Sequence, residues 1–141
     1  ILSKGWIMKI DGGCQCGAIK FEATVDPESC GICHCTDCQK FSGSAFRIGV
    51  VAQEKNFAFL SGAPKTYVKT AESGNHRAQV FCPDCGTHIF STSIGDGHKE
   101  FRIRTPTTNQ SSQLMPKSQG WFRSAQSWVT AISAIPSREK Q

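Results

Sequence analysis

Apolar and polar side chains alternate most regularly at residues 19–25 (IKFEATV), where every second residue is apolar. This period of two predicts a strand with one buried face. Other short runs rich in β-branched and aromatic residues recur between turn residues, and they predict further strands. The predicted strands are 18–25, 44–51, 57–60, 66–69, 77–81, 88–93 and 101–104.

Helical patterns are weak along the chain. Only residues 36–41 and 124–134 have the composition of short helices. Residues 105–119 (TPTTNQSSQLMPKSQ) are polar and predict an exposed loop. We therefore expect a mostly β fold of small antiparallel sheets with minor helix, in which loops carry the cysteines.

The length and composition fit one small globular domain. The chain has 141 residues, of which 38% are hydrophobic and 19% charged, as in a soluble folded protein. No apolar run approaches the roughly 20 residues that span a bilayer, and no secretory signal is recognisable. We expect a cytoplasmic protein without a membrane partner. Its predicted organisation is an N-terminal segment (1–11, with Met8 as a candidate native start), one domain (12–136) and a tail (137–141).

Eight cysteines in so short a chain indicate either a disulfide framework or metal ligation. Their spacing favours metal, because sulfurs separated by one or two residues converge readily on one ion. A reducing compartment favours the same interpretation. The formal net charge of +5 would fall close to neutral if all the cysteines were thiolates on two Zn²⁺ ions. The basic residues are therefore weak support for a nucleic-acid partner, and they fit charge compensation or attraction of a small anionic substrate.

The first cysteine cluster is divided between two segments. Cys82-Pro-Asp-Cys85-Gly86 has the pattern of a zinc knuckle, whose glycine permits a left-handed turn. Cys14 and Cys16, flanked by glycines, are the natural complement, and four thiolates would close a structural zinc site that clips two segments together. A redox pair at Cys82 and Cys85 is the alternative, but no βαβ pattern surrounds it.

The second cluster allows two interpretations. Cys33, Cys35 and Cys38 would supply three thiolates and leave one position free for a ligand, which is the arrangement of a catalytic zinc. If Cys30 also ligates, the site is closed by four thiolates. The spacing leaves both interpretations open. His34 lies between two ligands, so we expect its ring to point away from the metal.

Three ordered segments carry a resemblance to a known family. They are GCQCGAIKF (13–21), CHCTDCQK (33–40) followed by SGSAF (42–46), and FCPDCGT (81–87). Together they resemble the signatures of the glutathione-dependent formaldehyde-activating enzyme family, which includes centromere protein V. The likeness extends from residue 12 to about residue 136 and is looser at 123–128 and 135–136.

The resemblance implies a fold, two metal sites and an activity. The fold would be a zinc-stabilised β-tent of the Mss-four-like kind, similar to the Rab-exchange zinc chaperones. The activity would join glutathione and formaldehyde into S-hydroxymethylglutathione, or break that carbon–sulfur bond as a lyase, with zinc as cofactor and glutathione as co-substrate. The implied structural zinc lies on Cys14, Cys16, Cys82 and Cys85, and the implied labile, catalytic zinc lies on Cys33, Cys35 and Cys38.

Other residues are candidates for supporting roles. Gly43, Ser44 and Phe46 follow the second cluster closely and are predicted to line the approach to it, although Phe46 could instead begin a core strand. The candidate general bases are His34, Asp37 and His88. Lys20, Lys40, Arg47 and Arg77 are expected to be solvated surface charges, of which one or two are candidates for binding glutathione carboxylates. Trp6, Trp121 and Trp128 are expected in packed positions.

Three functions compete on these observations. The first is a zinc carbon–sulfur lyase or synthase that acts on a small-molecule thiol adduct, and it requires an open second site. The second is a non-enzymatic zinc module that binds a protein or nucleic-acid partner, and it would fit a site closed by Cys30. The third is a redox or metal-storage protein. The identity of the fourth ligand at the second zinc discriminates between these functions. Each of the three functions is compatible with a homo-oligomer.

Overall fold

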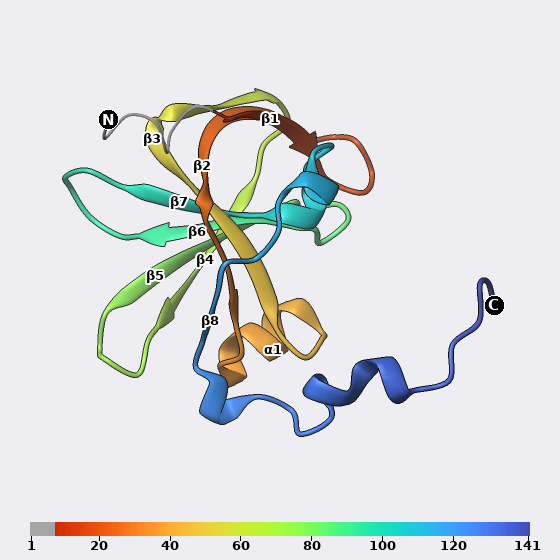
Figure 1. Cartoon of the computed structure of the whole chain (residues 1–141). Coiled ribbons are helices and arrows are strands. Elements are labelled where there is room, and N and C mark those ends of the chain that lie inside the picture. The colour runs from red at the N-terminus through yellow and green to blue at the C-terminus, as the bar shows by residue number, and fades with distance from the viewer. Residues whose placement is uncertain (1–7) are drawn as a thin grey trace.

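The computed structural model describes residues 8–141, so Trp6 lies outside the described part. Figure 1 shows a body of strands with one short helix, from which the C-terminal segment runs away. The strands are β1 (Met8–Gly13), β2 (Lys20–Cys33), β3 (Arg47–Ser61), β4 (Lys65–Thr70), β5 (His76–Phe81), β6 (His88–Ser93), β7 (Glu100–Arg104) and β8 (Ser118–Gly120). The helix is α1 (Thr36–Ser42), and the 3-10 turns are η2 (Thr105–Thr107), η3 (Ser111–Gln113), η4 (Phe122–Ser124) and η5 (Val129–Ala134).

The strands form one continuous sheet in the order β1-β2-β3-β7-β6-β5-β4, with β8 added alongside β2. All pairs are antiparallel except β2 with β8. The prediction of a mostly antiparallel β fold with minor helix is confirmed. β1 was not predicted, and it extends the sheet to Met8, before the expected start of the domain.

β2 and β3 are longer than predicted, and their length positions the second cysteine cluster. β2 continues to Cys33, and β3 joins two predicted strands into one of 15 residues. Their register shifts between Asp26 and Gly31, where Pro27 cannot donate to the ladder. Pairing then resumes, and it places Cys33 opposite Arg47.

The core of the sheet is aromatic. The ring of Phe57 lies 5.3 Å from that of Phe21, 5.1 Å from that of Phe90 and 5.3 Å from that of Phe101, measured between centroids. Such clusters combine large apolar burial with favourable ring geometry. Cys14 and Cys82 belong to the same buried cluster, so the first cysteine group is continuous with the core.

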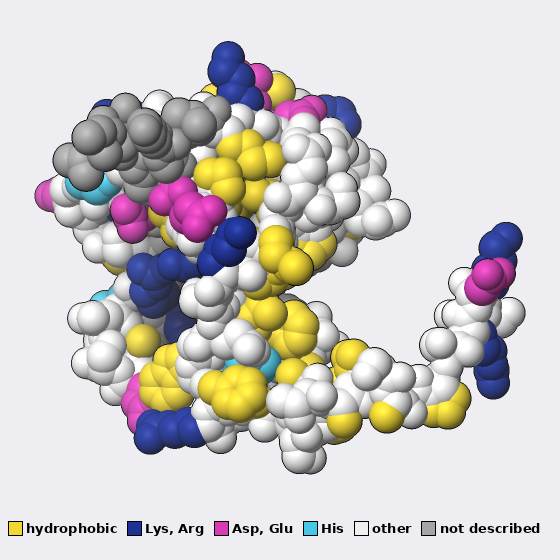
Figure 2. All heavy atoms as spheres, viewed as in Figure 1, with side chains coloured by type: hydrophobic (Ala, Val, Ile, Leu, Met, Phe, Trp, Pro, Cys, Tyr) yellow, Lys and Arg dark blue, Asp and Glu magenta, His cyan; other side chains and the backbone are white. Residues whose placement is uncertain are grey.

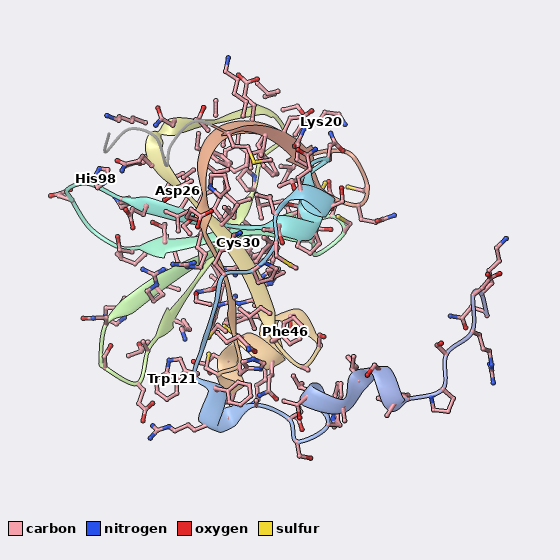
Figure 3. The ribbon with its side chains drawn as sticks, in the orientation of Figure 1. Lys20, Asp26, Cys30, Phe46, His98 and Trp121 are labelled. Carbon is pink, nitrogen blue, oxygen red and sulfur yellow. The ribbon has the colours of Figure 1, made fainter. Side chains whose placement is uncertain are left out.

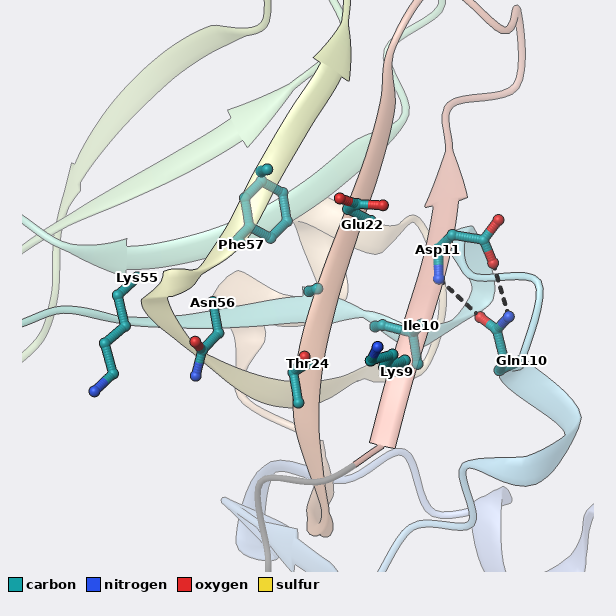
Figure 4. A pocket seen from close by; sticks show the side chains of 11 residues that line it. Lys9, Ile10, Asp11, Glu22, Thr24, Lys55, Asn56, Phe57 and Gln110 are labelled. Carbon is teal, nitrogen blue, oxygen red and sulfur yellow. Dashed lines mark hydrogen bonds between the residues drawn. The ribbon is translucent and has the colours of Figure 1, made fainter. Parts of the chain in front are cut away.

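The segment 105–119 is mostly exposed, as its polar composition predicts, but three of its residues are buried. Leu114 is buried in the core, and Thr105 and Thr108 are also buried. The Thr108 hydroxyl donates to the carbonyl of Thr105, so local bonds satisfy the polar side chains. Figure 4 shows Gln110 hydrogen-bonded to β1, where its side-chain amide donates to the Asp11 carboxylate at 2.7 Å.

The C-terminal segment also differs from expectation. The predicted helix 124–134 is absent: only the short 3-10 turns η4 (Phe122–Ser124) and η5 (Val129–Ala134) form there. Trp121 and Trp128, which were expected to be packed, are each 45% exposed, and the Arg123 guanidinium lies over the Trp121 ring. Within residues 8–141, no helix is both long and apolar enough to cross a membrane.

Candidate metal centres and the adjoining cavity

The four cysteines of the first cluster meet between the β1–β2 turn and the β5–β6 turn. The sulfurs of Cys14, Cys16, Cys82 and Cys85 all lie within 4.8 Å of one another. Those of Cys14 and Cys16 are 3.6 Å apart, and those of Cys16 and Cys82 are 3.8 Å apart. A tetrahedral zinc with Zn–S bonds of about 2.3 Å requires sulfurs about 3.8 Å apart. The cluster therefore fits a four-thiolate zinc site.

Backbone turns aim these sulfurs inward. Gly86 has φ = 79°, and its N–H donates to the Cys82 carbonyl at 2.8 Å. This is the left-handed turn expected of a zinc knuckle. The N–H of Ile19 donates to the Cys14 sulfur at 3.2 Å. The hydroxyl and backbone of Thr87 lower the pKa of Cys85 to about 5, which favours its thiolate.

The second cluster forms where β2 ends and α1 begins. Cys33 is the last residue of β2, Cys35 is the N-cap of α1, and Cys38 lies within the helix. Their sulfurs lie within 4.8 Å of one another. The Cys38 N–H donates to the Cys35 sulfur at 3.3 Å, and the Cys38 thiol lowers the pKa of Cys33 to about 7. Three thiols with this geometry could hold a second metal ion and leave room for an outside ligand.

Cys30 does not belong to the second cluster. Its side chain is fully buried in the core, and its thiol donates to the Leu114 carbonyl at 3.5 Å. Cys30 and Cys33 lie three residues apart on one strand, and side chains at odd separations point to opposite faces. Figure 3 labels Cys30 near the middle of the molecule, away from Phe46 and α1. The three-cysteine interpretation is thereby favoured over the closed four-cysteine one.

Arg47 is buried beside the second cluster, contrary to the expectation of a solvated surface charge. It is 8% exposed. Its Nε donates to the Cys38 sulfur at 3.2 Å, its Nη1 donates to Gln79 Oε1 at 2.8 Å, and its guanidinium lies over the Phe41 ring. The position of this arginine inside the apolar run of 44–51 was the signal that sequence reasoning missed. Lys20 and Lys40 are exposed as expected, and Arg77 is half-buried.

A cavity of about 450 Å³, here called the site cavity, adjoins Arg47. Ser44 and Phe46 line it, whereas Gly43, which caps α1 with φ = 62°, does not. Figure 2 shows the surface hollowed on the side where Figure 3 labels Phe46. The side chains that matter most for its chemistry are Ser44, Phe46, Arg47, Thr87, His88 and Arg104.

The three candidate bases lie in different surroundings. His34 is fully buried, and its Nε2 is 2.8 Å from Gln119 Oε1. Asp37 pairs with the Lys69 ammonium at 2.6 Å. His88 lines the site cavity and also a second cavity, and Phe41 lines both of them. Within residues 8–141 no hydrogen bond holds the His88 ring, so it is the candidate that is free to exchange a proton with a ligand.

The fold and the two cysteine groups define a class, namely small antiparallel β proteins with metal-type cysteine clusters. The sequence matches the family described as glutathione-dependent formaldehyde-activating enzyme over residues 9–124, and the chain belongs to this family. A crystal structure of a Rhodobacter sphaeroides protein is similar in fold, with a TM-score of 0.59 and 17% identity. That similarity covers 77% of this chain and 98% of the other.

Proposed function

We propose that the chain is a zinc-dependent carbon–sulfur lyase or synthase that forms or breaks a thiol–carbonyl adduct such as S-hydroxymethylglutathione. The observation that carries this proposal is the three-cysteine cluster without Cys30, beside a cavity that Arg47 lines. Family membership supports the same reaction class. The alternative of a non-enzymatic binding module depended on a second site closed by Cys30, and the bond from Cys30 to Leu114 removes that support.

The two clusters would have different roles. Cys14, Cys16, Cys82 and Cys85 would hold a structural zinc, and Cys33, Cys35 and Cys38 would hold the second zinc. A zinc ion on three thiolates supplies a soft centre that favours a thiol over water. Arg47 holds the Cys38 sulfur through its Nε and offsets negative charge there.

His88 is suited to take the proton that a substrate thiol loses. Burial, followed by the charges of Arg47 and Arg104, lowers the pKa of His88 from its ordinary value of 6.5. The ring is therefore neutral at pH 7 and can accept a proton. Its place on the wall of the site cavity puts it beside the same ligand that Ser44 and Phe46 would contact.

Replacement of His88 by Asn should slow the reaction by about 100-fold, the low end for loss of a general base. In the wild type, kcat/KM should fall only below pH 6.5, because the base stays neutral until the pH drops through its lowered pKa. The variant should lose this acidic limb. His98→Asn, which changes an exposed histidine in the β6–β7 turn, is the matched control. An unchanged profile in His88→Asn would exclude His88 as the base.

The function itself is tested by exchange NMR. The measured quantity is the rate at which glutathione and S-hydroxymethylglutathione interconvert in the presence of formaldehyde. The zinc-loaded protein should accelerate this interconversion in proportion to its concentration. Equal rates with and without protein that carries two zinc ions would refute the proposed reaction.

A further inference from the structure

Within residues 8–141, Arg104 is a buried cation without an acidic partner. It ends β7, is 7% exposed, and donates from Nη2 to the Ser91 hydroxyl. Its Nε has no hydrogen-bond partner among the described residues. A buried charged group that lacks partners is costly, and in a native site it calls for an explanation such as a ligand.

A second buried arginine shares the cavity with Arg104. Arg47 lines the same cavity, and burial followed by the charge of Arg47 lowers the pKa of Arg104 to about 9. The ion pairs of residues 8–141 are Lys69–Asp37 and Lys117–Glu28, and neither includes an arginine. The Cys38 sulfur accepts a hydrogen bond from Arg47, but no sulfur accepts one from Arg104 in this part of the chain. Two guanidinium groups, those of Arg47 and Arg104, thus line the cavity, and within residues 8–141 the Nε of Arg104 is an unused hydrogen-bond donor.

The rest of the cavity suits a small organic anion. Ser44, Thr87 and Thr107 add hydroxyl groups, whereas Phe46 and Ile48 provide an apolar wall. Its volume of about 450 Å³ lies within the usual range for small-molecule sites. Guanidinium groups match the planar geometry of a carboxylate, with which they form paired, charge-assisted hydrogen bonds.

We propose that the site cavity binds a carboxylate of the thiol substrate through the guanidinium groups of Arg47 and Arg104. This inference rests on the proposed function, because it assumes that the substrate thiol reaches the neighbouring three-cysteine cluster. Arg47 touches both the cluster and the cavity, so the carboxylate must lie close to the thiol in the substrate. The preferred substrates are therefore short mercapto acids or cysteine-derived thiols, and amino thiols without a carboxylate should bind poorly.

The test is calorimetric titration of the zinc-loaded protein with 3-mercaptopropionate and with its methyl ester. Wild type should bind the acid at least about tenfold more tightly, which is about 1.4 kcal/mol, since only the acid offers a carboxylate for charge-assisted hydrogen bonds from the guanidinium groups. Arg104→Gln should lose this preference, and Arg104→Lys should retain part of it. Arg102→Gln, an exposed arginine on the same strand, is the matched control and should behave as wild type. Equal affinity of wild type for acid and ester would overturn the proposal.

Two further measurements separate the possible failures. Thermal unfolding and zinc content show whether each variant is folded. If Arg104→Gln is not folded, the preference for acid over ester in wild type and in Arg104→Lys tests the carboxylate site. Propionate, which has no thiol, should shift the NMR signals of Arg104 and Ser44 in wild type. In Arg104→Lys it should shift the Ser44 signal less. Propionate binding without any catalysis of adduct exchange would support the carboxylate site and count against the proposed function. Catalysis of adduct exchange without any propionate shift or acid preference would support the proposed function and contradict the carboxylate site.

Discussion

Cys82→Ser should leave the chain unfolded or insoluble. Cys82 is fully buried within the core, and its sulfur lies 3.8 Å from that of Cys16. Binding of a structural zinc contributes on the order of 10–16 kcal/mol to the folding of small zinc domains. The net stability of a domain is only about 5–15 kcal/mol. If loss of one thiolate releases the zinc, the fold loses about as much free energy as its whole net stability.

Circular dichroism and the zinc content of the purified variant provide the measurement. The matched control is Cys30→Ala, because Cys30 is equally buried but lies outside both clusters. It should cost only about 1 kcal/mol, as expected for a small core change, and should keep both zinc ions. A soluble Cys82→Ser protein that unfolds near the wild-type temperature would contradict the structural role of the first cluster.

Cys35→Ala should abolish catalysis while the protein stays folded. Cys35 contributes one of the three sulfurs of the second cluster and caps α1. Loss of an N-cap costs about 1 kcal/mol, which the sheet can tolerate, but a site with two remaining thiols should not retain its metal. The zinc content should fall from two ions per chain to one, and the rate of adduct exchange should fall to that of the uncatalysed reaction.

Thr36→Ala is the matched control for Cys35→Ala. Thr36 is the neighbouring residue in the first turn of α1, and its side chain is exposed. This variant should keep two zinc ions and the wild-type rate. If Cys35→Ala also keeps its second zinc, or if it remains active with one, the second cluster is not the reaction centre.

The cysteine pairs were predictable because their chemistry is local. The spacing of Cys82 and Cys85 with the following Gly86 is sufficient to predict a knuckle, and the structure confirms its left-handed turn. The pairing of distant Cys14 with Cys82 followed from the need for four ligands. The alternation at residues 19–25 likewise predicted a strand with one buried face, and Phe21 and Val25 are fully buried.

The position of Cys30 was not predictable, because it depends on the length of β2. Asp26, Pro27 and Gly31 are typical of a turn, so the predicted strand ended at residue 25. Pairing with β3 and β8 nevertheless continues the strand to Cys33. Once both cysteines lie on one strand, their odd separation sends them to opposite faces. Tertiary pairing thus separates Cys30 from the cluster of Cys33, Cys35 and Cys38.

The buried arginines were missed for a related reason. Arg47 was treated by its residue type, because arginine is mostly exposed, and Arg104 was not singled out. Arg47 begins β3 and Arg104 ends β7, and the antiparallel pairing of these strands places Arg104 opposite Gly49, two residues from Arg47. Their burial therefore depends on strands that are distant in sequence.

The polar segment 105–119 is mostly exposed as predicted. Its composition did not indicate that Leu114 enters the core, or that Thr105 and Thr108 are buried with the Thr108 hydroxyl bonded locally.

Catalysis measured during stepwise removal of zinc by a mild chelator tests the central claim most directly. The second cluster has three ligands, all within residues 33–38, whereas the first has four and joins two distant segments. We predict that one zinc leaves first, that adduct exchange stops at that point, that the near-UV circular dichroism spectrum is retained, and that added zinc restores the rate. If both ions leave together with loss of structure, or if the one-zinc protein remains fully active, the second cluster is not an open catalytic centre.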